Sequence, residues 1–208
     1  MVLAVLTAVI TAYLLGNVNG SVCISALVAN DDVRKHGSGN AGLTNFFRNY
    51  GSWSALLVIL VDMLKAAAAT FGAAFMLKSF GYYREGLVLG AVVVSLGHDF
   101  PALLGFKGGK GILCGLTVAL ILDWRIALVM LGVFIIAFAI TRYVSLGSIL
   151  GAVTCSVGFG VVYYGNWIMM GGGIFIGLLA IFMHRSNIKR LVTGKETKTH
   201  LIHKDLNK

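Results

Sequence analysis

The sequence predicts an all-α integral membrane protein with about seven transmembrane helices. Three observations predict this class: 58% of the 208 residues are hydrophobic while only 12% are charged, the mean hydropathy is +0.87, and the apolar residues fall into seven runs separated by short polar segments. Soluble domains of this length do not have such a composition. A membrane-spanning helix needs roughly 20 mostly apolar residues, which most of these runs supply.

The seven runs follow one another along the chain. They cover residues 1–29 with a polar interruption at 16–21, then 53–77, 86–104, 112–122, 126–141, 148–164 and 167–183. The fourth run has about 11 residues, fewer than the hydrocarbon core demands, so five or six true spans are the alternative to seven. The first run is too long for a signal peptide and no Lys or Arg precedes it, so we expect it to be the first span.

The distribution of Lys and Arg predicts the orientation, because cytoplasmic segments carry the excess. With seven spans and the N-terminus outside, six of the seventeen lie in inner loops and seven in the tail, residues 185–208. Three lie outside, and Lys65 lies within a span. The C-terminus is therefore expected in the cytoplasm. A basic tail beside anionic lipid accounts for the net charge of +9, so nucleic acid is not an expected partner.

The chain is expected to form a single domain, residues 1–208, that ends in a basic cytoplasmic tail, residues 185–208. No internal repeat, low-complexity tract or linker divides it. Its three cysteines, Cys23, Cys114 and Cys155, are dispersed and have no metal-ligand or disulfide spacing. We therefore expect no metal and interpret the cysteines as packing residues.

Two loops have the composition of phosphate-binding segments. Residues 36–48 read HGSGNAGLTNFFR, where glycines free the backbone N–H groups to face an anion and Arg48 can add a bidentate contact. Residues 97–111 read GHDFPALLGFKGGKG, in which glycines flank Lys107 and Lys110. The second loop is not a Walker A motif, since Gly111 stands where Ser or Thr is required. Its alternative interpretation is an interfacial turn with snorkelling lysines.

Two further segments carry anion-binding groups on the same predicted side. Residues 141–148 read TRYVSLGS and residues 184–190 read HRSNIKR. In a helix His184 and Asn187 would stand at i, i+3 and share one face. A lone interfacial histidine is usually only hydrated, but four clusters of glycines, hydroxyls and cations on one side predict a common phosphate site.

Four segments, GSGNAGLTNFFR, GHDFPALLGFKGGKGI, TRYVSLGSI and HRSNIKRLVTGKE, together resemble the bacterial acyl-phosphate:glycerol-3-phosphate acyltransferases, the PlsY family. The resemblance extends from about residue 13 to residue 196. The chain departs from the usual family pattern at Leu43, at residues 16–19 and at residues 112–114, which line and shape the site.

The resemblance implies transfer of a fatty acyl group from acyl phosphate to the 1-hydroxyl of glycerol 3-phosphate, giving lysophosphatidic acid and phosphate without coenzyme A. It implies acyl phosphate, glycerol 3-phosphate and membrane lipid as partners, no cofactor, and a monomer. It also implies a location in the cytoplasmic membrane of a bacterial cell, with the active site toward the cytoplasm. By motif position the catalytic residues are Ser38, Arg48, Lys110, His184 and Asn187. The substrate-binding residues are Gly37, Gly39, Asn40, Thr44, Asn45, Lys107, Gly108, Gly109, Arg142 and Ser145.

The roles implied by the resemblance leave the proton acceptor open. Arg48 and Lys110 are expected to bind phosphates, while Ser38, Thr44 and Ser145 hydrogen-bond phosphate or carbonyl oxygens. In one alternative His184, oriented by Asn187, is the general base that takes the proton of the attacking hydroxyl. In the other, a phosphate oxygen of the substrate takes this proton and His184 only positions the substrate. Ser38 is not expected to be a nucleophile, because acyl phosphate is already activated.

Two charges lie inside the second run, where charges usually mark function. Asp62 and Lys65 stand at i, i+3, and we expect them to form a helix-stabilising ion pair rather than a catalytic one. Asp99, in the third loop, is likewise either a structural or a functional residue.

The alternative function is a small transporter of a phosphate-containing solute, which predicts polar residues throughout the spans and an inverted repeat. A non-catalytic scaffold would leave the phosphate-binding segments without a purpose.

Overall fold

The structure, a computed structural model, describes residues 1–199, and every regular element in that range is helical. The apolar helices of the bundle are α1 (Val2–Asn17), α4 (Ser52–Lys78), α5 (Tyr83–Asp99), α6 (Ile112–Leu122), α7 (Trp124–Thr141), α8 (Val144–Val162) and α9 (Trp167–Met183). Short helices join them: α2 (Gly20–Ala29), η1 (Val33–Lys35), α3 (Leu43–Tyr50), η2 (Ala102–Leu104) and α10 (Arg185–Val192). The predicted all-α class is confirmed.

The apolar runs correspond closely to these helices. Four of the described helices, α4, α5 with η2, α7 and α8, are long and apolar enough to cross a membrane, and two bent pairs raise the number to six. The bent pairs are α1 with α2, at 43°, and α9 with α10, at 56°. Helix α6 coincides with the predicted fourth run but has only 11 residues. The count of seven spans therefore stays a prediction.

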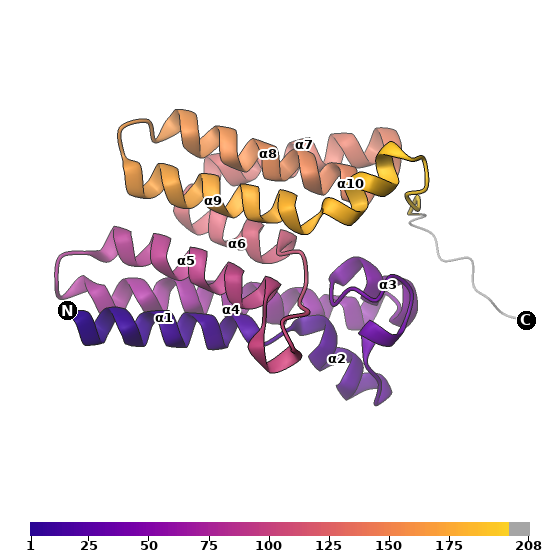
Figure 1. The fold of residues 1–208 in the computed structure, drawn as a ribbon, viewed down its shortest axis with the longest axis horizontal. Helices are drawn as coiled ribbons and strands as arrows, with labels where there is room; N and C mark the ends of the chain where they lie inside the picture. The colour runs from indigo at the N-terminus through magenta and orange to yellow at the C-terminus, as the bar shows by residue number, and fades with distance from the viewer. Residues whose placement is uncertain (200–208) are drawn as a thin grey trace, which may run out of the picture.

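The helices form two layers with α6 between them (Figure 1). One layer contains α1, α4 and α5, and the other contains α7, α8 and α9. Helix α6 contacts α4 and α5 on one side and α7 and α9 on the other. Because neighbouring helices surround α6, its short length leaves few backbone groups facing lipid.

Small residues set the close approach of the helices, as is common in membrane bundles. A Cβ added to Gly16 would lie 2.8 Å from the Cα of Gly97, so α1 and α5 touch backbone to backbone. A Cβ on Gly177 would lie 2.6 Å from the Ala152 carbonyl oxygen, which joins α9 to α8 in the same way. Cys114 and Cys155 are buried and unpaired within the bundle, as packing residues are, whereas Cys23 is exposed.

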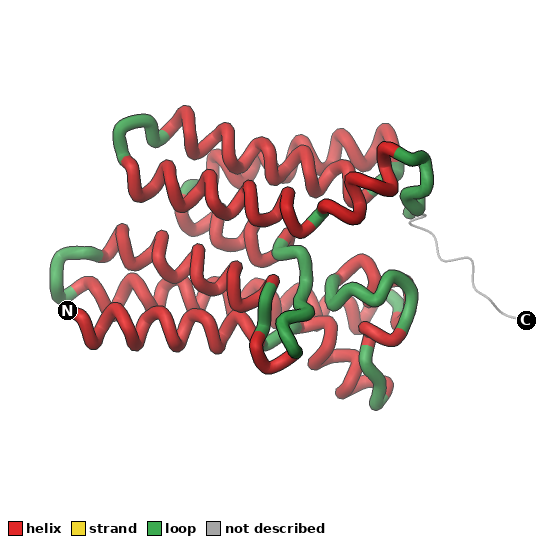
Figure 2. The backbone as a smooth tube through the Cα atoms, viewed as in Figure 1, coloured by secondary structure: helices red, strands yellow, loops and turns green. Residues whose placement is uncertain are grey.

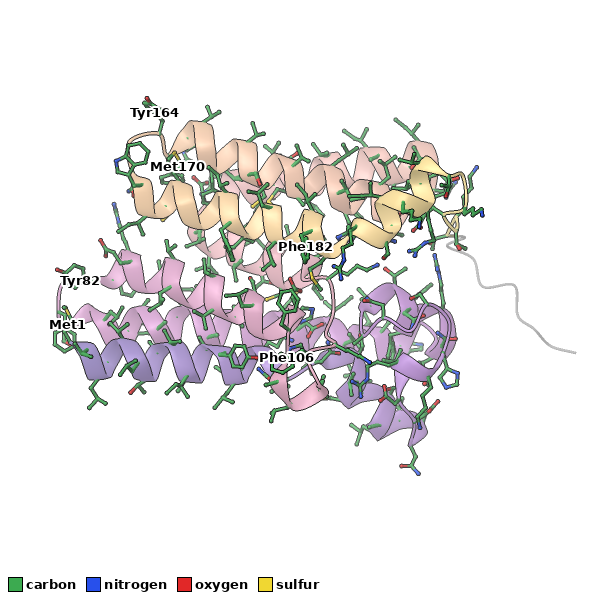
Figure 3. All side chains as sticks on the ribbon, in the orientation of Figure 1. Met1, Tyr82, Phe106, Tyr164, Met170 and Phe182 are labelled. Carbon is green, nitrogen blue, oxygen red and sulfur yellow. The ribbon has the colours of Figure 1, made fainter. Side chains whose placement is uncertain are left out.

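Large apolar side chains cover much of the outer surface of the bundle. Leu3, Ile140 and Val161 are each more than 70% exposed, a pattern suited to lipid contact rather than water. Figure 3 places Tyr82 and Tyr164 at the end of the bundle opposite α3 and α10. The N-terminus lies at the same end as Tyr82, far from α10 (Figure 1). Which end faces the cytoplasm stays a prediction, as does the tail, whose residues 200–208 lie outside the described residues.

Candidate active site

A cavity of about 720 Å³ lies at the end of the bundle near α3 and α10. It collects residues from all four predicted segments, although these are far apart in sequence. The predicted residues that line it are Gly37, Ser38, Asn40, Thr44, Asn45, Arg48, Lys110, Ser145, His184 and Asn187. The loops within these segments gather toward the same end, whereas the turns at residues 79–82 and 163–166 lie at the opposite end (Figure 2).

The five other predicted residues, Gly39, Lys107, Gly108, Gly109 and Arg142, are not among those that line the cavity. Lys107 is exposed. Gly108 and Gly109 pack on His98, where an added Cβ would lie 2.0 Å from its carbonyl oxygen and 2.2 Å from its Nε2, respectively. Arg142 has a positive φ of 63° and its carbonyl accepts from the Thr199 N–H at 2.9 Å. The two glycines therefore shape a loop instead of facing the cavity.

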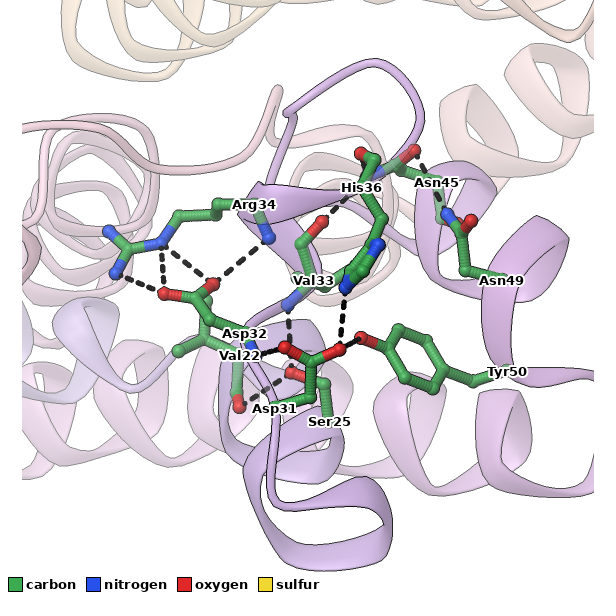
Figure 4. Close-up of polar contacts among 10 residues, drawn as sticks. All are labelled: Val22, Ser25, Asp31, Asp32, Val33, Arg34, His36, Asn45, Asn49 and Tyr50. Carbon is green, nitrogen blue, oxygen red and sulfur yellow. Dashed lines mark hydrogen bonds and ion pairs between the residues drawn. The ribbon is translucent and has the colours of Figure 1, made fainter.

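The loop of residues 36–42, here called the glycine loop, is organised by Asn45 on α3 (Figure 4). The buried Asn45 amide nitrogen donates to the carbonyls of Val33 and His36, both at 3.0 Å, and its oxygen accepts from the Ser38 N–H at 3.0 Å. A Cβ on Gly37 would lie 2.3 Å from that oxygen, so only glycine fits there. Asn45 thus lines the cavity, but its amide group binds backbone groups of the loop and fixes the position of Ser38.

A second set of contacts ties the base of the glycine loop to α3. Asp31 accepts hydrogen bonds from the Tyr50 hydroxyl at 2.8 Å and from His36 Nε2 at 2.6 Å (Figure 4). The bond from Tyr50 and the neighbouring His36 hold the pKa of Asp31 below its ordinary value, and burial together with Asp31 raises the pKa of Tyr50 to about 12. The carboxylate therefore stays charged near neutral pH and fixes the entry to the loop.

The loop of residues 105–111, here called the lysine loop, meets the C-terminal segment through Lys110. Its ammonium donates to Asn187 Oδ1, and Asn187 Nδ2 in turn donates to Glu196 Oε1 at 2.8 Å. Glu196 also accepts from Ser145 Oγ at 2.7 Å and from Arg190 Nε at 2.6 Å. Three of the four predicted segments are therefore joined by one carboxylate and one amide.

Burial and charge set the protonation of this network. Burial, with a smaller contribution from the nearby Arg190 and Arg48, lowers the pKa of Lys110 to about 8, while Glu196 opposes this shift. Burial alone would raise the pKa of Glu196, but hydrogen bonds from Ser145, Asn187 and Arg190 bring it below its ordinary value. At neutral pH Lys110 is thus charged and lies with Arg48 and Arg190 near the carboxylate of Glu196.

His184 lies at the junction of α9 and α10 and is only 3% exposed. Its Nδ1 is 2.8 Å from the Ala180 carbonyl oxygen, which can only accept, so Nδ1 carries the proton and Nε2 keeps its lone pair. Our expectation that Asn187 orients His184 is wrong: the Asn187 amide binds Lys110 and Glu196. The reason is that Lys110 and Glu196, both remote in sequence, approach Asn187 from other segments and engage both ends of its amide.

Several residues that were not among the predicted site residues also line the cavity. They are Asn49, Asp62, His98, Ser148, Arg190, Glu196 and Thr197. Glu196 belongs to the segment HRSNIKRLVTGKE, and an acid within a basic anion-binding segment was the signal that could have identified it. The expected ion pair between Asp62 and Lys65 is confirmed, with 2.8 Å between Lys65 Nζ and Asp62 Oδ1.

Apolar side chains of α6, α7, α8 and α9 also line the cavity, and the part that they enclose is here called the apolar branch. They include Leu113, Leu116, Met130, Leu131, Phe134, Ala152, Cys155 and Ile176. One opening therefore combines a cationic end with a space suited to a hydrocarbon chain. Residues 1–199 contain no group of three or more His, Cys, Asp or Glu side chains arranged to hold a metal ion.

Comparison with known proteins identifies the family. The family model described as glycerol-3-phosphate acyltransferase matches residues 6–194. Proteins named glycerol-3-phosphate acyltransferase from Finegoldia magna and Clostridioides difficile are 38% and 39% identical to this chain. Both alignments cover 91% of this chain, with 93% of the first protein and 92% of the second.

Two solved structures of PlsY, an integral membrane glycerol 3-phosphate acyltransferase, have the same fold. Its glycerol 3-phosphate form has a TM-score of 0.84 and 36% identity, over 94% of this chain and 96% of that one. Its lysophosphatidic acid form has a TM-score of 0.81 and 35% identity, over 94% and 95%. The predicted resemblance, the membrane fold and the enzyme class are confirmed, and the transporter alternative is not supported. The chain belongs to the glycerol-3-phosphate acyltransferase family of integral membrane proteins, the PlsY family.

Proposed function

We propose that the cavity transfers a fatty acyl group from acyl phosphate to the 1-hydroxyl of glycerol 3-phosphate, forming lysophosphatidic acid and inorganic phosphate. The observation that carries this proposal is the union of a cationic end and an apolar branch in one cavity. A phosphate-bearing acyl donor needs both, and a small phosphate-bearing acceptor needs the first. The names of the relatives and the two forms of the solved PlsY support the acceptor and the product.

The cationic end has the groups that two phosphates require. Lys110 and Arg48 supply charge-assisted hydrogen bonds, which are about twice as strong as neutral ones. Ser38, Thr44 and Ser145 add hydroxyls that line the same cavity. These donors also face the acyl carbonyl oxygen, which becomes negative when the acceptor hydroxyl attacks the acyl carbon. Preorganised donors of this kind usually supply the largest single part of the rate enhancement.

The reaction then needs one proton transfer. The 1-hydroxyl oxygen forms the new ester bond to the acyl carbon, and the bond from that carbon to the phosphate oxygen breaks. His184 Nε2 takes the hydroxyl proton and passes it to the leaving phosphate, or an oxygen of the substrate phosphate takes it directly while His184 positions the acceptor. Acyl phosphate is already activated, so Ser38 acts as a hydrogen-bond donor and not as a nucleophile.

The acyl chain occupies the apolar branch among α6, α7, α8 and α9, so that the donor reaches the cavity from the bilayer. The cavity faces the cytoplasm of a bacterial cell, where the basic tail is expected and where glycerol 3-phosphate is available. The protein works as a monomer in the cytoplasmic membrane, and no cofactor or metal is required.

Purified protein in detergent tests the donor directly. Labelled glycerol 3-phosphate is incubated with palmitoyl phosphate or palmitoyl coenzyme A, and labelled lysophosphatidic acid and free phosphate are measured. We expect product and equimolar phosphate from palmitoyl phosphate alone. Product from the thioester only would contradict the proposed donor, and no product from either would contradict the proposed reaction.

The pKa of Lys110 predicts a pH dependence. Only the protonated lysine can hold a phosphate, so kcat/KM for glycerol 3-phosphate is expected to be full near pH 7 and to fall as the pH rises through about 8. The second pKa of the substrate phosphate is about 6, so above pH 7 the phosphate is already a dianion. Its titration therefore does not contribute to the decline of kcat/KM near pH 8. In Lys110→Arg the cation persists, so kcat/KM of this variant should stay level to about pH 10. The same decline in both proteins would exclude Lys110 as the titrating group.

A further inference from the structure

Three ionisable side chains lie together inside the bundle, next to the cavity. Asp62 and Lys65 on α4 and His98 on α5 are between 2% and 5% exposed. Charges within a membrane span are costly and are seldom present without a specific role. The contacts of the three side chains show what they hold together.

Lys65 binds the end of α1. Its ammonium donates to the carbonyls of Gly16, at 3.4 Å, and Val18, while lying 2.8 Å from Asp62 Oδ1. Helix α1 ends at Asn17, so these carbonyls lack helical partners and would otherwise be unsatisfied in an apolar environment. Lys65 therefore caps the first half of the broken N-terminal helix pair.

Asp62 binds the other half. Its Oδ1 accepts from the Gly20 N–H, the first residue of α2, at 3.1 Å. Between the two halves, the Asn19 side chain caps α2 by accepting from the Val22 N–H and donates to the Ala41 carbonyl at 3.0 Å. Ala41 belongs to the glycine loop. The ion pair on α4 thus fixes the break between α1 and α2, and the break in turn holds the glycine loop.

His98 connects the same ion pair to the lysine loop. Its Nδ1 is 2.7 Å from Lys65 Nζ, and since an ammonium only donates, Nδ1 accepts and the ring proton is on Nε2. The Nε2 edge of the ring faces Gly109, whose N–H donates to the His98 carbonyl at 3.2 Å. Lys110 is the next residue, so the position of the ring determines where the lysine enters the cavity.

We infer that Asp62, Lys65 and His98 form a positioning unit that sets the spacing between the glycine loop and the lysine loop. This inference rests on the proposed function, in which groups on these two loops bind the phosphates of the two substrates. The three residues act through the loops and not on the substrates. A shift of about 1 Å in such a support can cost about 10²-fold in rate.

The double variant Asp62→Asn/Lys65→Met tests the unit without leaving one buried charge unpaired, which would itself be destabilising. We expect a fall of about 10²-fold in kcat/KM, with weakened glycerol 3-phosphate binding measured by calorimetry. Asp123→Asn is the matched control, because Asp123 is also buried and ion-paired, at 2.7 Å from Arg125, at the opposite end of the bundle. It should lower the melting temperature and leave kcat and KM unchanged. Wild-type kcat/KM in the double variant, or an equal kinetic loss in Asp123→Asn, would overturn the inference.

Substitution of His98 gives a second test if the double variant fails to fold. His98→Asn places an amide oxygen near the position of Nδ1 and keeps an acceptor for Lys65, whereas His98→Leu removes it. We expect His98→Asn to retain at least about tenfold more kcat/KM than His98→Leu, and equal values would overturn the inference. Because the calorimetric measurement needs no acyl donor, failure of the proposed donor would appear in the wild-type protein as binding without turnover.

Discussion

Replacement of His184 by alanine is expected to lower kcat by about 10² to 10⁴-fold, the usual contribution of a general acid or base. His184 is buried at the cavity wall, and its Nδ1–H is held by the Ala180 carbonyl, so Nε2 is the ring nitrogen available to a hydroxyl proton. Turnover with saturating acyl phosphate and glycerol 3-phosphate measures the effect. No other described histidine in the cavity has a free basic nitrogen, because His98 accepts from Lys65 at Nδ1.

His36→Ala is the comparison for this variant, since His36 is exposed and does not line the cavity. His36 binds Asp31 at the base of the glycine loop, so we expect a loss of kcat that is much smaller than in His184→Ala. The dependence on pH separates the two roles that His184 can have. As a general base it should give kcat an acidic limb that disappears in His184→Ala; as a positioning group it should leave the shape of the profile unchanged. Near wild-type turnover in His184→Ala would exclude both roles.

Replacement of Lys110 by methionine is expected to lower kcat/KM by about 10² to 10³-fold, as removal of one preorganised charge donor does in other active sites. Methionine retains most of the apolar stem and removes the ammonium. Because that ammonium is proposed to hold a substrate phosphate and also binds Asn187, KM for glycerol 3-phosphate should rise while kcat falls. Steady-state kinetics at pH 7, where Lys110 is charged, measure both constants.

Lys107→Met is the matched control, since Lys107 lies three residues away on the same loop but is exposed and does not line the cavity. We expect its kcat/KM to remain within about threefold of the wild-type value, because exposed charges contribute little. Equal losses in the two variants would mean that the loop acts through its general positive charge. That result would contradict the specific role given to Lys110.

The sequence predicted the helices well because each apolar run is separated from the next by glycine or charge. The run at 112–122 coincides with α6, and the polar interruption at 16–21 marks the break between α1 and α2. The sequence could not show how α6 tolerates its short length. That depends on its contacts with α4, α5, α7 and α9, which follow from the tertiary arrangement.

Within the site, composition predicted which segments meet but not which atoms face the cavity. Gly108 and Gly109 have the composition of a phosphate cradle, yet they lie against His98, a contact that no spacing rule contains. Asn187 was paired with His184 by helical spacing, whereas its amide binds Lys110, 77 residues away, and Glu196. Local periodicity carries no information about such long-range partners.

A structure with glycerol 3-phosphate and a non-transferable acyl phosphonate bound together would test the central claim most directly. We predict both phosphorus atoms at the cationic end of the cavity, near Lys110 and Arg48, and the acyl chain among α6, α7, α8 and α9. The 1-hydroxyl should then face the acyl carbon from the side of His184. An acyl chain outside this apolar branch, or a glycerol 3-phosphate bound away from Lys110 and Arg48, would contradict the account.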